Sequence, residues 1–251
     1  MHLQAHLFPT WGDVVGSFRT SRNCTSFNQG KVPEWGAATP GAASLCQRFH
    51  NSYHFTTLYN THHRIAVYSA YRFQTSDGGG WEKRWFVEPQ LVDLTWGVEM
   101  RDGYWLGQDN PDIYLGERQA LNEDYTHSGF DRGHLNPNGH HAVPSCNATF
   151  MLTNMVPQGP KLNQNAWHNY ESQLTDLFNG HNWIFKNVNI PEYLWNAYCC
   201  LDNNGTSSAG ATALNTEQNW VGRHTIADLT AFLQQYANSP VGELFFNNSE
   251  A

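Results

Sequence analysis

FDRGHLNPNGHH, residues 130–141, gathers a carboxylate, a guanidinium, two amides and three imidazoles within twelve positions. Asn136-Pro137 and Asn138-Gly139 are turn signals that prevent a continuous helix here. One interpretation is a turn-rich surface loop, whose polar residues serve the backbone conformation. The other is a catalytic loop, because binding and catalytic side chains concentrate on loops that a rigid scaffold positions. The flanking sequence decides between the two.

Length and composition predict one large folded domain. The chain has 251 residues, of which 40% are hydrophobic and 14% aromatic, which is ample to bury a core. We predict an irregular N-terminal arm over residues 1–45 and a single domain over residues 46–251. The formal charge of −8 argues against non-specific coating of nucleic acid or anionic membranes. A polyanionic substrate would therefore need a local basic patch or a metal ion, and no apolar run is long enough to span a bilayer.

The cysteines and sequons favour an extracellular protein. The five cysteines lack C-x-x-C pairs and zinc-finger spacing, so we expect disulfides, with one thiol left over. Cys24 and Cys46 are candidates to tether the arm, and the adjacent Cys199 and Cys200 are expected to bond to different partners. Glycosylation sequons occur at Asn23, Asn147, Asn204 and Asn247. The sequons are permitted glycosylation sites in a secreted protein but prove little alone, and the first residues, MHLQAHLFPTWGDVVGSF, do not show the pattern of a secretory leader.

Hydrophobic periodicity predicts the main elements. Residues 63–73 alternate apolar and polar positions and, with the following QTSDGGG and WEKRWFVEP, predict a β-hairpin. Residues 148–158, ATFMLTNMVPQ, are apolar between breakers and predict a buried strand. Helical spacing predicts helices over 163–178 and 225–237. Residues 203–213, NNGTSSAGATA, are expected to form an exposed loop.

The polar residues of this region fit the hydrolysis of a phosphodiester, which needs a base, a cation and contacts to the phosphate. His134 is the candidate general base, since a neutral imidazole accepts a proton near pH 7. Asn163, at the start of a predicted helix, offers a hard amide oxygen that suits Mg²⁺, with Mn²⁺ or Ca²⁺ as alternative ions. Glu171 lies about two turns further along that helix, better placed to orient a water on the ion than to bind the ion directly.

DRGH, followed by TNMVPQ, LNQNAW and then Glu171, resembles the DNA/RNA non-specific endonuclease family. The resemblance implies an α+β fold with a ββα-metal (His-Me finger) core at residues 127–180, inside a mixed, mainly antiparallel sheet. It implies that His134 is the general base, Asn163 the metal ligand and Glu171 the water-orienting carboxylate. It also assigns Arg132 to the phosphate or the metal waters. Three further substrate-binding or supporting positions follow from the same motifs: Asp131, Asn154 and Gln158.

The same resemblance implies an arginine upstream of DRGH that neutralises transition-state charge, at Arg84 or, as the alternative, at Arg72. The implied activity is metal-dependent cleavage of DNA and RNA with little sequence preference, leaving 5′-phosphate and 3′-hydroxyl ends. Residues 45–73 and 189–205 are similar to the vertebrate endonuclease domain-containing 1 group of this family, whose members are secreted.

The segment after the predicted helix departs from that group. Relatives are expected to have a further β-strand there, whereas residues 179–188, NGHNWIFKNV, are all that connects the two parts, so we predict a lost strand. This keeps open a second function, a catalytically inactive, disulfide-stabilised binding module with a nuclease-like fold. A third interpretation groups His134, His140 and His141 in a structural zinc site, against the usual zinc spacings. Otherwise His140 and His141 are expected to be solvated loop residues.

Overall fold

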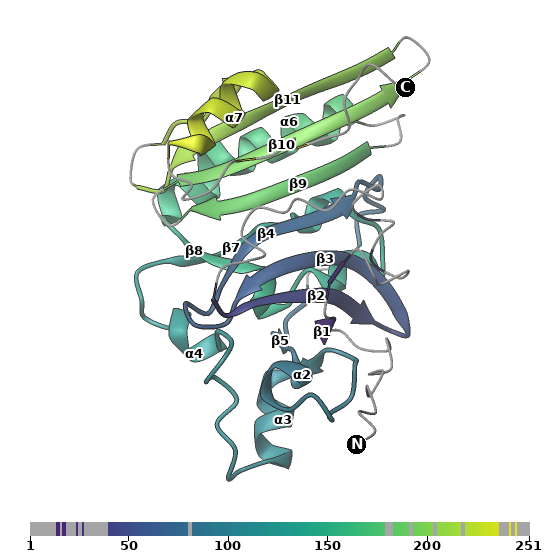
Figure 1. The fold of residues 1–251 in the computed structure, drawn as a ribbon, viewed down its shortest axis with the longest axis vertical. Coiled ribbons are helices and arrows are strands. Elements are labelled where there is room, and N and C mark those ends of the chain that lie inside the picture. The colour runs from purple at the N-terminus through teal and green to yellow at the C-terminus, as the bar shows by residue number, and fades with distance from the viewer. Residues whose placement is uncertain are drawn as a thin grey trace, which may run out of the picture.

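The computed structural model describes residues 14–15, 17–18, 24, 27, 40–79, 82–178, 183–190, 193–202, 205–216, 219–235, 241 and 244. Within these ranges an eight-stranded sheet forms the centre of the molecule, in the order β1-β2-β3-β4-β9-β10-β11-β12 (Figure 1). Every neighbouring pair in it is antiparallel. The predicted α+β class with a mainly antiparallel sheet is therefore confirmed.

The sheet, the smaller ladders and the helices have the following bounds. The sheet contains β1 Val14–Val15, β2 Ala42–Phe49, β3 Ser52–Asn60, β4 Ile65–Arg72, β9 Trp183–Ile190, β10 Tyr193–Asp202, β11 Gly205–Leu214 and β12 Gly222–His224. Two separate ladders pair β5 Phe86–Val87 with β6 Arg101–Asp102, and β7 Asp131–His134 with β8 Met155–Gln158. The α-helices are α2 Pro89–Val92, α3 Gly103–Asp109, α4 Asn122–Tyr125, α5 Ser145–Ala148, α6 His168–Phe178 and α7 Ile226–Gln234. Three other helical segments are the 3₁₀ turns η2 Asn138–His140 and η3 Leu152–Asn154 and the π-helical η4 Leu162–Trp167.

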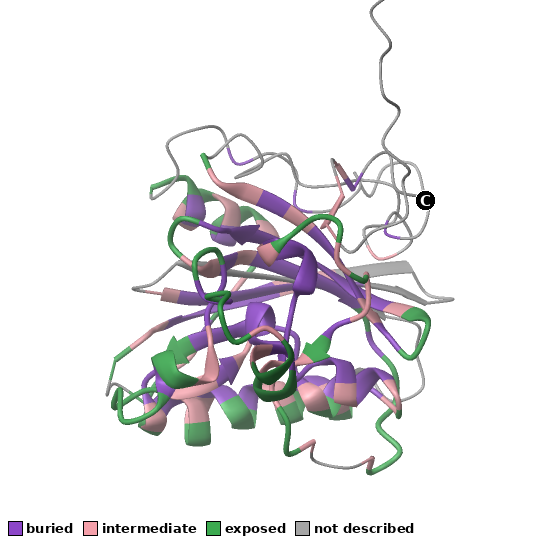
Figure 2. Ribbon diagram, turned by 90° about the horizontal axis from the view of Figure 1, so that it is seen from below, coloured by how far each residue is buried: buried purple, intermediate pink, exposed green. Residues whose placement is uncertain are grey.

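Alternating residues of the central strands supply two separate cores, because successive side chains of a strand point to opposite faces of the sheet. On β4, Tyr71 belongs to the first core and its neighbour Ala70 to the second. Buried residues accordingly concentrate in the central strands (Figure 2). The helix residues that complete these cores are Tyr170 and Leu174 for the first and Leu229 and Leu233 for the second. Helix α6 therefore covers one face of the sheet and α7 the other.

Both predicted helices are confirmed. Segment η4 runs directly into α6, so residues 162–178 are continuously helical, close to the predicted range 163–178. Helix α7 begins after Thr225, whose side chain accepts a hydrogen bond from the backbone N of Asp228 at 3.1 Å. This cap satisfies one of the first N–H groups of the helix, which have no partner within it.

The predicted hairpin was wrong. Residues 65–72 do form a strand, β4, but its partners are β3 on one edge and β9 on the other. No edge of β4 is left for the segment that follows the glycine-rich loop. That segment forms the short β5 instead, which pairs with β6.

Two other segments differ from their predicted conformations. Only Met155–Gln158 of the expected strand over 148–158 forms a strand, because the 3₁₀ turn η3 separates it from Met151, which makes a single β-bridge to Phe86. The expected loop over 203–213 is mostly strand β11. A Cβ on Gly210 of β11 would lie 2.6 Å from Leu229 Cδ2 and 2.6 Å from the Asn196 carbonyl oxygen. The small residues that suggested a loop therefore include one that lets α7 pack closely on the sheet.

The predicted loss of a strand after α6 was also wrong. Strand β9, residues 183–190, occupies the place between β4 and β10 and pairs with both. The short connection thus supplies a strand itself. The hydrogen-bonded order of the sheet is continuous across this point.

The N-terminal arm is joined to the sheet by a Cys24–Cys46 disulfide, as expected from their positions. Strand β2 begins at Ala42 and so crosses the predicted limit between arm and domain. Three of the sequon asparagines, Asn23, Asn204 and Asn247, and the side chain of Cys200 lie outside the described residues. None of the helices in the described part of the chain has the length and apolar character that crossing a membrane requires.

Candidate active site

Strands β7 and β8 and the helix that follows bring the DRGH and LNQNAW motifs together. The strands pair with Asp131 opposite Gln158 and His134 opposite Met155. Gln158 ends β8 and η4 begins at Leu162, so the helix starts beside the Asp131 end of β7. The order strand, loop, strand, helix places the candidate base and the candidate metal ligand on adjoining elements.

His134 is the last residue of β7, and the hydrogen bonding of one of its ring nitrogens is unusual. Its Nε2 is buried and has no hydrogen-bond partner within the described residues, although part of the residue remains exposed. The ring lies edge-on to Phe150 at 5.0 Å and 6.5 Å from the ring of Trp85, measured between centroids. Burial lowers the pKa of His134 to about 4. The imidazole is therefore neutral at pH 7 and retains the lone pair that a general base needs.

Asn163 is held in one orientation by Asp131. The Asn163 Nδ2 donates to Asp131 Oδ2 at 2.9 Å, and Gln164 Nε2 donates to the same oxygen at 2.8 Å. Because the amide nitrogen is committed to the carboxylate, the Asn163 Oδ1 is turned away from it. A half-buried amide oxygen in a fixed orientation suits a hard cation that keeps most of its waters.

Glu171 lies on α6 and connects the helix to the loop after β7. Burial raises the pKa of its carboxyl group to about 8, while a hydrogen bond with Trp167 acts in the opposite direction. Its backbone carbonyl accepts a hydrogen bond from His140 Nε2 at 3.0 Å. A carboxyl group with this pKa is mostly protonated at pH 7, and a nearby cation would lower the pKa and favour the ionised carboxylate.

The two candidate arginines have partners within the protein. Arg132 Nη2 donates to the Asn122 carbonyl at 2.9 Å, and its guanidinium lies over the rings of Trp85 at 5.2 Å and Tyr125 at 5.4 Å. Arg84 Nη2 forms an ion pair with Glu82 Oε2 at 2.9 Å. Arg132 shares Trp85 as a neighbour with His134, whereas Arg84 reaches a phosphate only by leaving Glu82. The alternative, Arg72, is an exposed residue at the end of β4.

Asn154 and Gln158 are both fully buried. Asn154 closes the loop after β7, since its side chain bonds the backbone N of Asn136 at 2.9 Å, the Asn136 carbonyl at 3.0 Å and the Thr149 carbonyl at 2.9 Å. Both amide atoms of Gln158 are without a partner among the described residues. A Cβ at Gly133 would collide with Gln158 Oε1, so the glycine of DRGH makes room for this side chain.

His140 and His141 were expected to be solvated, and this was wrong, since each is 1% exposed. The Glu171 carbonyl can only accept, so His140 Nε2 donates to it and His140 Nδ1 accepts from the Tyr71 hydroxyl at 2.9 Å. His141 Nε2 donates to Asn136 Oδ1 at 2.5 Å. The histidines thus tie the loop to the first core. Within the described residues no three His, Cys, Asp or Glu side chains converge on a possible metal position, so the zinc interpretation has no support.

Sequence reasoning missed Trp85 and Tyr71. Trp85 packs against both Arg132 and His134, but it lies in the segment assigned to the wrong hairpin. Tyr71 was assigned only to an apolar strand face, and its hydroxyl contact with His140 joins residues 69 positions apart. Neither contact has a local sequence signal.

The chain matches known proteins over most of its length. A model of the DNA/RNA non-specific endonuclease family matches residues 37–241. The chain is 32% identical over 206 residues to the Endonuclease domain-containing 1 protein of Homo sapiens. The aligned region covers 74% of this chain and 40% of the human protein. It is 30% identical over 142 residues to a Nuclease of Nostoc sp., covering 47% of this chain and 52% of the relative. Human mitochondrial Endonuclease G is 48% identical over 61 residues, 24% of this chain and 20% of that protein. The match therefore spans less than half the length of the human Endonuclease domain-containing 1 protein.

Proposed function

Because the chain belongs to the DNA/RNA non-specific endonuclease family, we propose that it is a metal-dependent nuclease that cleaves DNA and RNA with little sequence preference. The observation that carries this proposal is the buried Nε2 of His134, which has no partner within the described residues. Buried polar atoms in folded proteins nearly always have one, and exceptions occur where a reacting molecule supplies it. A water molecule poised to attack a phosphate is such a partner.

His134 is the proposed general base. Its neutral imidazole takes a proton from the water as the water oxygen bonds to phosphorus and the bond from phosphorus to the 3′ oxygen breaks. The leaving 3′ oxygen takes a proton from solvent, so the products carry 5′-phosphate and 3′-hydroxyl ends. A pKa of about 4 makes His134 a weak base in the free protein. A neighbouring phosphate would raise that pKa, since negative charge stabilises the imidazolium.

Asn163 is the proposed ligand of Mg²⁺, with Mn²⁺ or Ca²⁺ as alternatives, through its amide oxygen. An ion held there would supply positive charge that stabilises the phosphate in the transition state. Asp131 acts as a positioning residue, because its carboxylate fixes the Asn163 amide. Glu171 is proposed to orient a water beside this site.

The remaining predicted residues are proposed to support these groups. Arg132 holds Trp85 and α4 in place beside His134, and Asn154 and Gln158 act through the loop and Gly133 rather than by touching the substrate. Arg84 is proposed to exchange Glu82 for a phosphate, since a partly exposed ion pair contributes only about 1 kcal/mol or less.

We also propose that residues 46–251 act as one secreted domain to which the Cys24–Cys46 disulfide ties the arm. Disulfides persist in oxidising compartments, and the sequons fit glycosylation there. This assignment is independent of the chemistry of the site.

Supercoiled-plasmid cleavage by the purified chain, with Mg²⁺ and with a chelator, tests the proposed activity. We expect nicking and linearisation that need the ion, and parallel degradation of an RNA transcript. A folded chain that cuts neither substrate with Mg²⁺, Mn²⁺ or Ca²⁺ would overturn the nuclease and favour the catalytically inactive binding module.

A further inference from the structure

A cavity of about 590 Å³ adjoins the candidate active site. Its lining comes mainly from the segment before β5, from α3 and from residues 113–115 and 121–124. Trp85 is one of the lining residues, and its ring lies 6.5 Å from the ring of His134 and 5.2 Å from the Arg132 guanidinium. The volume is in the range of sites that hold small organic groups. Trp85 therefore links the cavity directly to the residues proposed to act on the phosphate.

The cavity presents aromatic rings to solvent. Tyr104 and Tyr114 both line it, and each is 67% exposed. Trp85 adds a third, half-buried ring. Exposed rings in a concave site offer faces on which a flat ring can stack, and base stacking on an aromatic side chain contributes about 1–3 kcal/mol.

The charges of the lining favour an uncharged occupant with a phosphate nearby. Lys83 is exposed and Arg84 can reach a phosphate by leaving Glu82, whereas Asp102 and Glu123 line the same cavity and repel a phosphate from its interior. The third lining carboxylate, Asp124, is paired with Arg64. A nucleotide divides its charge in this way, since its base is neutral and its phosphate anionic.

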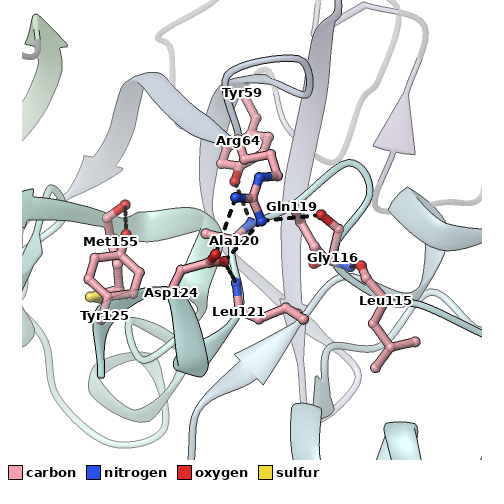
Figure 3. Close-up of polar contacts among 10 residues, drawn as sticks. All are labelled: Tyr59, Arg64, Leu115, Gly116, Gln119, Ala120, Leu121, Asp124, Tyr125 and Met155. Atoms are coloured by element: carbon pink, nitrogen blue, oxygen red, sulfur yellow. Dashed lines mark hydrogen bonds and ion pairs between the residues drawn. The ribbon is translucent and has the colours of Figure 1, made fainter. Parts of the chain in front are cut away.

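The segment 115–124, which contributes Leu115 and residues 121–124 to the cavity wall, is held in place by polar contacts (Figure 3). Arg64 bridges the Asp124 carboxylate at 3.0 Å and the Gly116 carbonyl at 3.3 Å, and the Tyr59 hydroxyl accepts from the backbone N of Ala120 at 3.0 Å. The next residue, Tyr125, donates to the Met155 carbonyl on β8 at 3.1 Å. The wall is thus tied both to the central sheet and to the strand that pairs with His134, which favours a preformed site.

We propose that this cavity binds an unpaired nucleobase of the substrate strand beside the bond that is cut, so that the chain prefers single-stranded nucleic acid. This inference rests on the proposed nuclease function and specifies its substrate. A duplex would have to unpair and unstack a base to fill the cavity, at a cost of a few kcal/mol.

Asn122 gives the cavity a polar group for the edge of such a base. It lines the cavity, and its Oδ1 is a buried acceptor with no partner among the described residues. Rotation of the side chain would offer this oxygen to an amino or imino group of the base. The backbone carbonyl of Asn122, which accepts from Arg132, is unaffected by that rotation.

Adjacent residues of α3 provide a matched test. Tyr104 and Trp105 are both exposed aromatics, at 67% and 60%, but only Tyr104 lines the cavity. Binding is measured by fluorescence anisotropy with a labelled short DNA strand and with the same strand annealed to its complement. His134→Ala is the background, so that nothing is cleaved. Tyr104→Ala should raise the Kd for the single strand about tenfold and Trp105→Ala less than about twofold, with little change for the duplex.

The two proposals fail in different ways. Equal effects of Tyr104→Ala and Trp105→Ala on the single strand, equal losses for strand and duplex, or no single-strand binding at all would overturn the nucleobase site. Each variant's urea midpoint shows that the fold is retained, and Asn122→Ala gives a second variant with the same expected selectivity for the single strand. Failure of the wild-type chain to cut any nucleic acid would overturn the nuclease, even if the single-strand selectivity were observed.

Discussion

The end of β7 and the loop that follows it hold two histidines, His134 and His140, whose hydrogen bonding differs. Burial lowers the pKa of both His134 and His140 to about 4. His140 uses both ring nitrogens, with Tyr71 and with the Glu171 carbonyl, whereas His134 Nε2 has no partner within the described residues. Residue type and pKa direction are shared, but His140 is fully buried and His134 only half-buried, so burial and hydrogen-bond partners together distinguish the two histidines.

The missing hydrogen bond of His134 Nε2 has a cost in folding free energy. A buried polar atom without a partner costs about 1–3 kcal/mol, and a folded protein keeps it only if the surroundings hold it in place. The loop behind His134 provides that support, since Asn154 makes three hydrogen bonds to it and His141 bonds Asn136. The hydrogen bonds of this loop thus hold His134 in place, although its Nε2 has no partner within the described residues.

Separate alanine variants of His134 and His140 test this contrast most strongly. His134→Ala should lower the plasmid cleavage rate about 10²- to 10⁴-fold, the range of general base catalysis, with little change in unfolding free energy. His140→Ala should instead destabilise the fold by about 2–3 kcal/mol, because it leaves buried partners unsatisfied. Initial rates and urea unfolding of both variants measure this. Full turnover by His134→Ala would exclude it as the base.

Acidification should unfold the chain through its buried histidines. The unfolded pKa is about 6.5 and that of folded His140 about 4, so between these values the unfolded state binds more protons. Stability is complete above pH 6.5 and falls as the pH drops towards 4, by about 3 kcal/mol for His140 alone. Urea unfolding at several pH values measures the slope. His140→Ala should reduce it and the exposed His168→Ala should not; equal slopes in both variants would contradict the assignment.

Asp131→Asn should weaken the proposed ion site without touching its ligand. The carboxylate accepts from Asn163 and Gln164, so the variant leaves the Asn163 amide less firmly oriented. Changes in such supporting groups typically lower metal affinity about 10- to 100-fold. We expect the Mg²⁺ concentration for half-maximal cleavage to rise by that factor. Gln164→Ala removes the other hydrogen bond to Asp131 and should change it far less; the reverse order would reject Asp131 as the positioning group.

Local sequence predicted well where His134 and Asn163 lie in the fold, whereas the roles proposed for them stay predictions. DRGH and LNQNAW place His134 and Asn163 on a strand and on the next helix, and the structure joins them through Asp131. Helical spacing similarly predicted α6 and α7. Motif and periodicity describe short stretches of chain, and these elements depend mainly on such stretches.

Sequence failed where contacts between distant segments decide the outcome. The strand β4 was identified, but its partners β3 and β9 depend on the whole sheet. Small polar residues predicted a loop where Gly210 lets α7 approach β11. The turn residues around His140 and His141 suggested exposure, because their bonding partners, such as Tyr71, are remote in the chain.

Tyr71→Phe should give the smallest effect of these variants. It tests whether the hydrogen bonds of His140 serve only the stability of the fold. The hydroxyl donates to His140 Nδ1, and the ring of Tyr71 is fully buried, so the variant removes one hydrogen bond while keeping the packing. We expect a loss of about 1 kcal/mol in unfolding free energy by urea titration. His140 keeps its bond to Glu171, so α6 stays tied to the loop and the cleavage rate should change little. A large loss of activity with unchanged stability would mean that His140 belongs to the reacting groups, and the division between the two histidines would then fail.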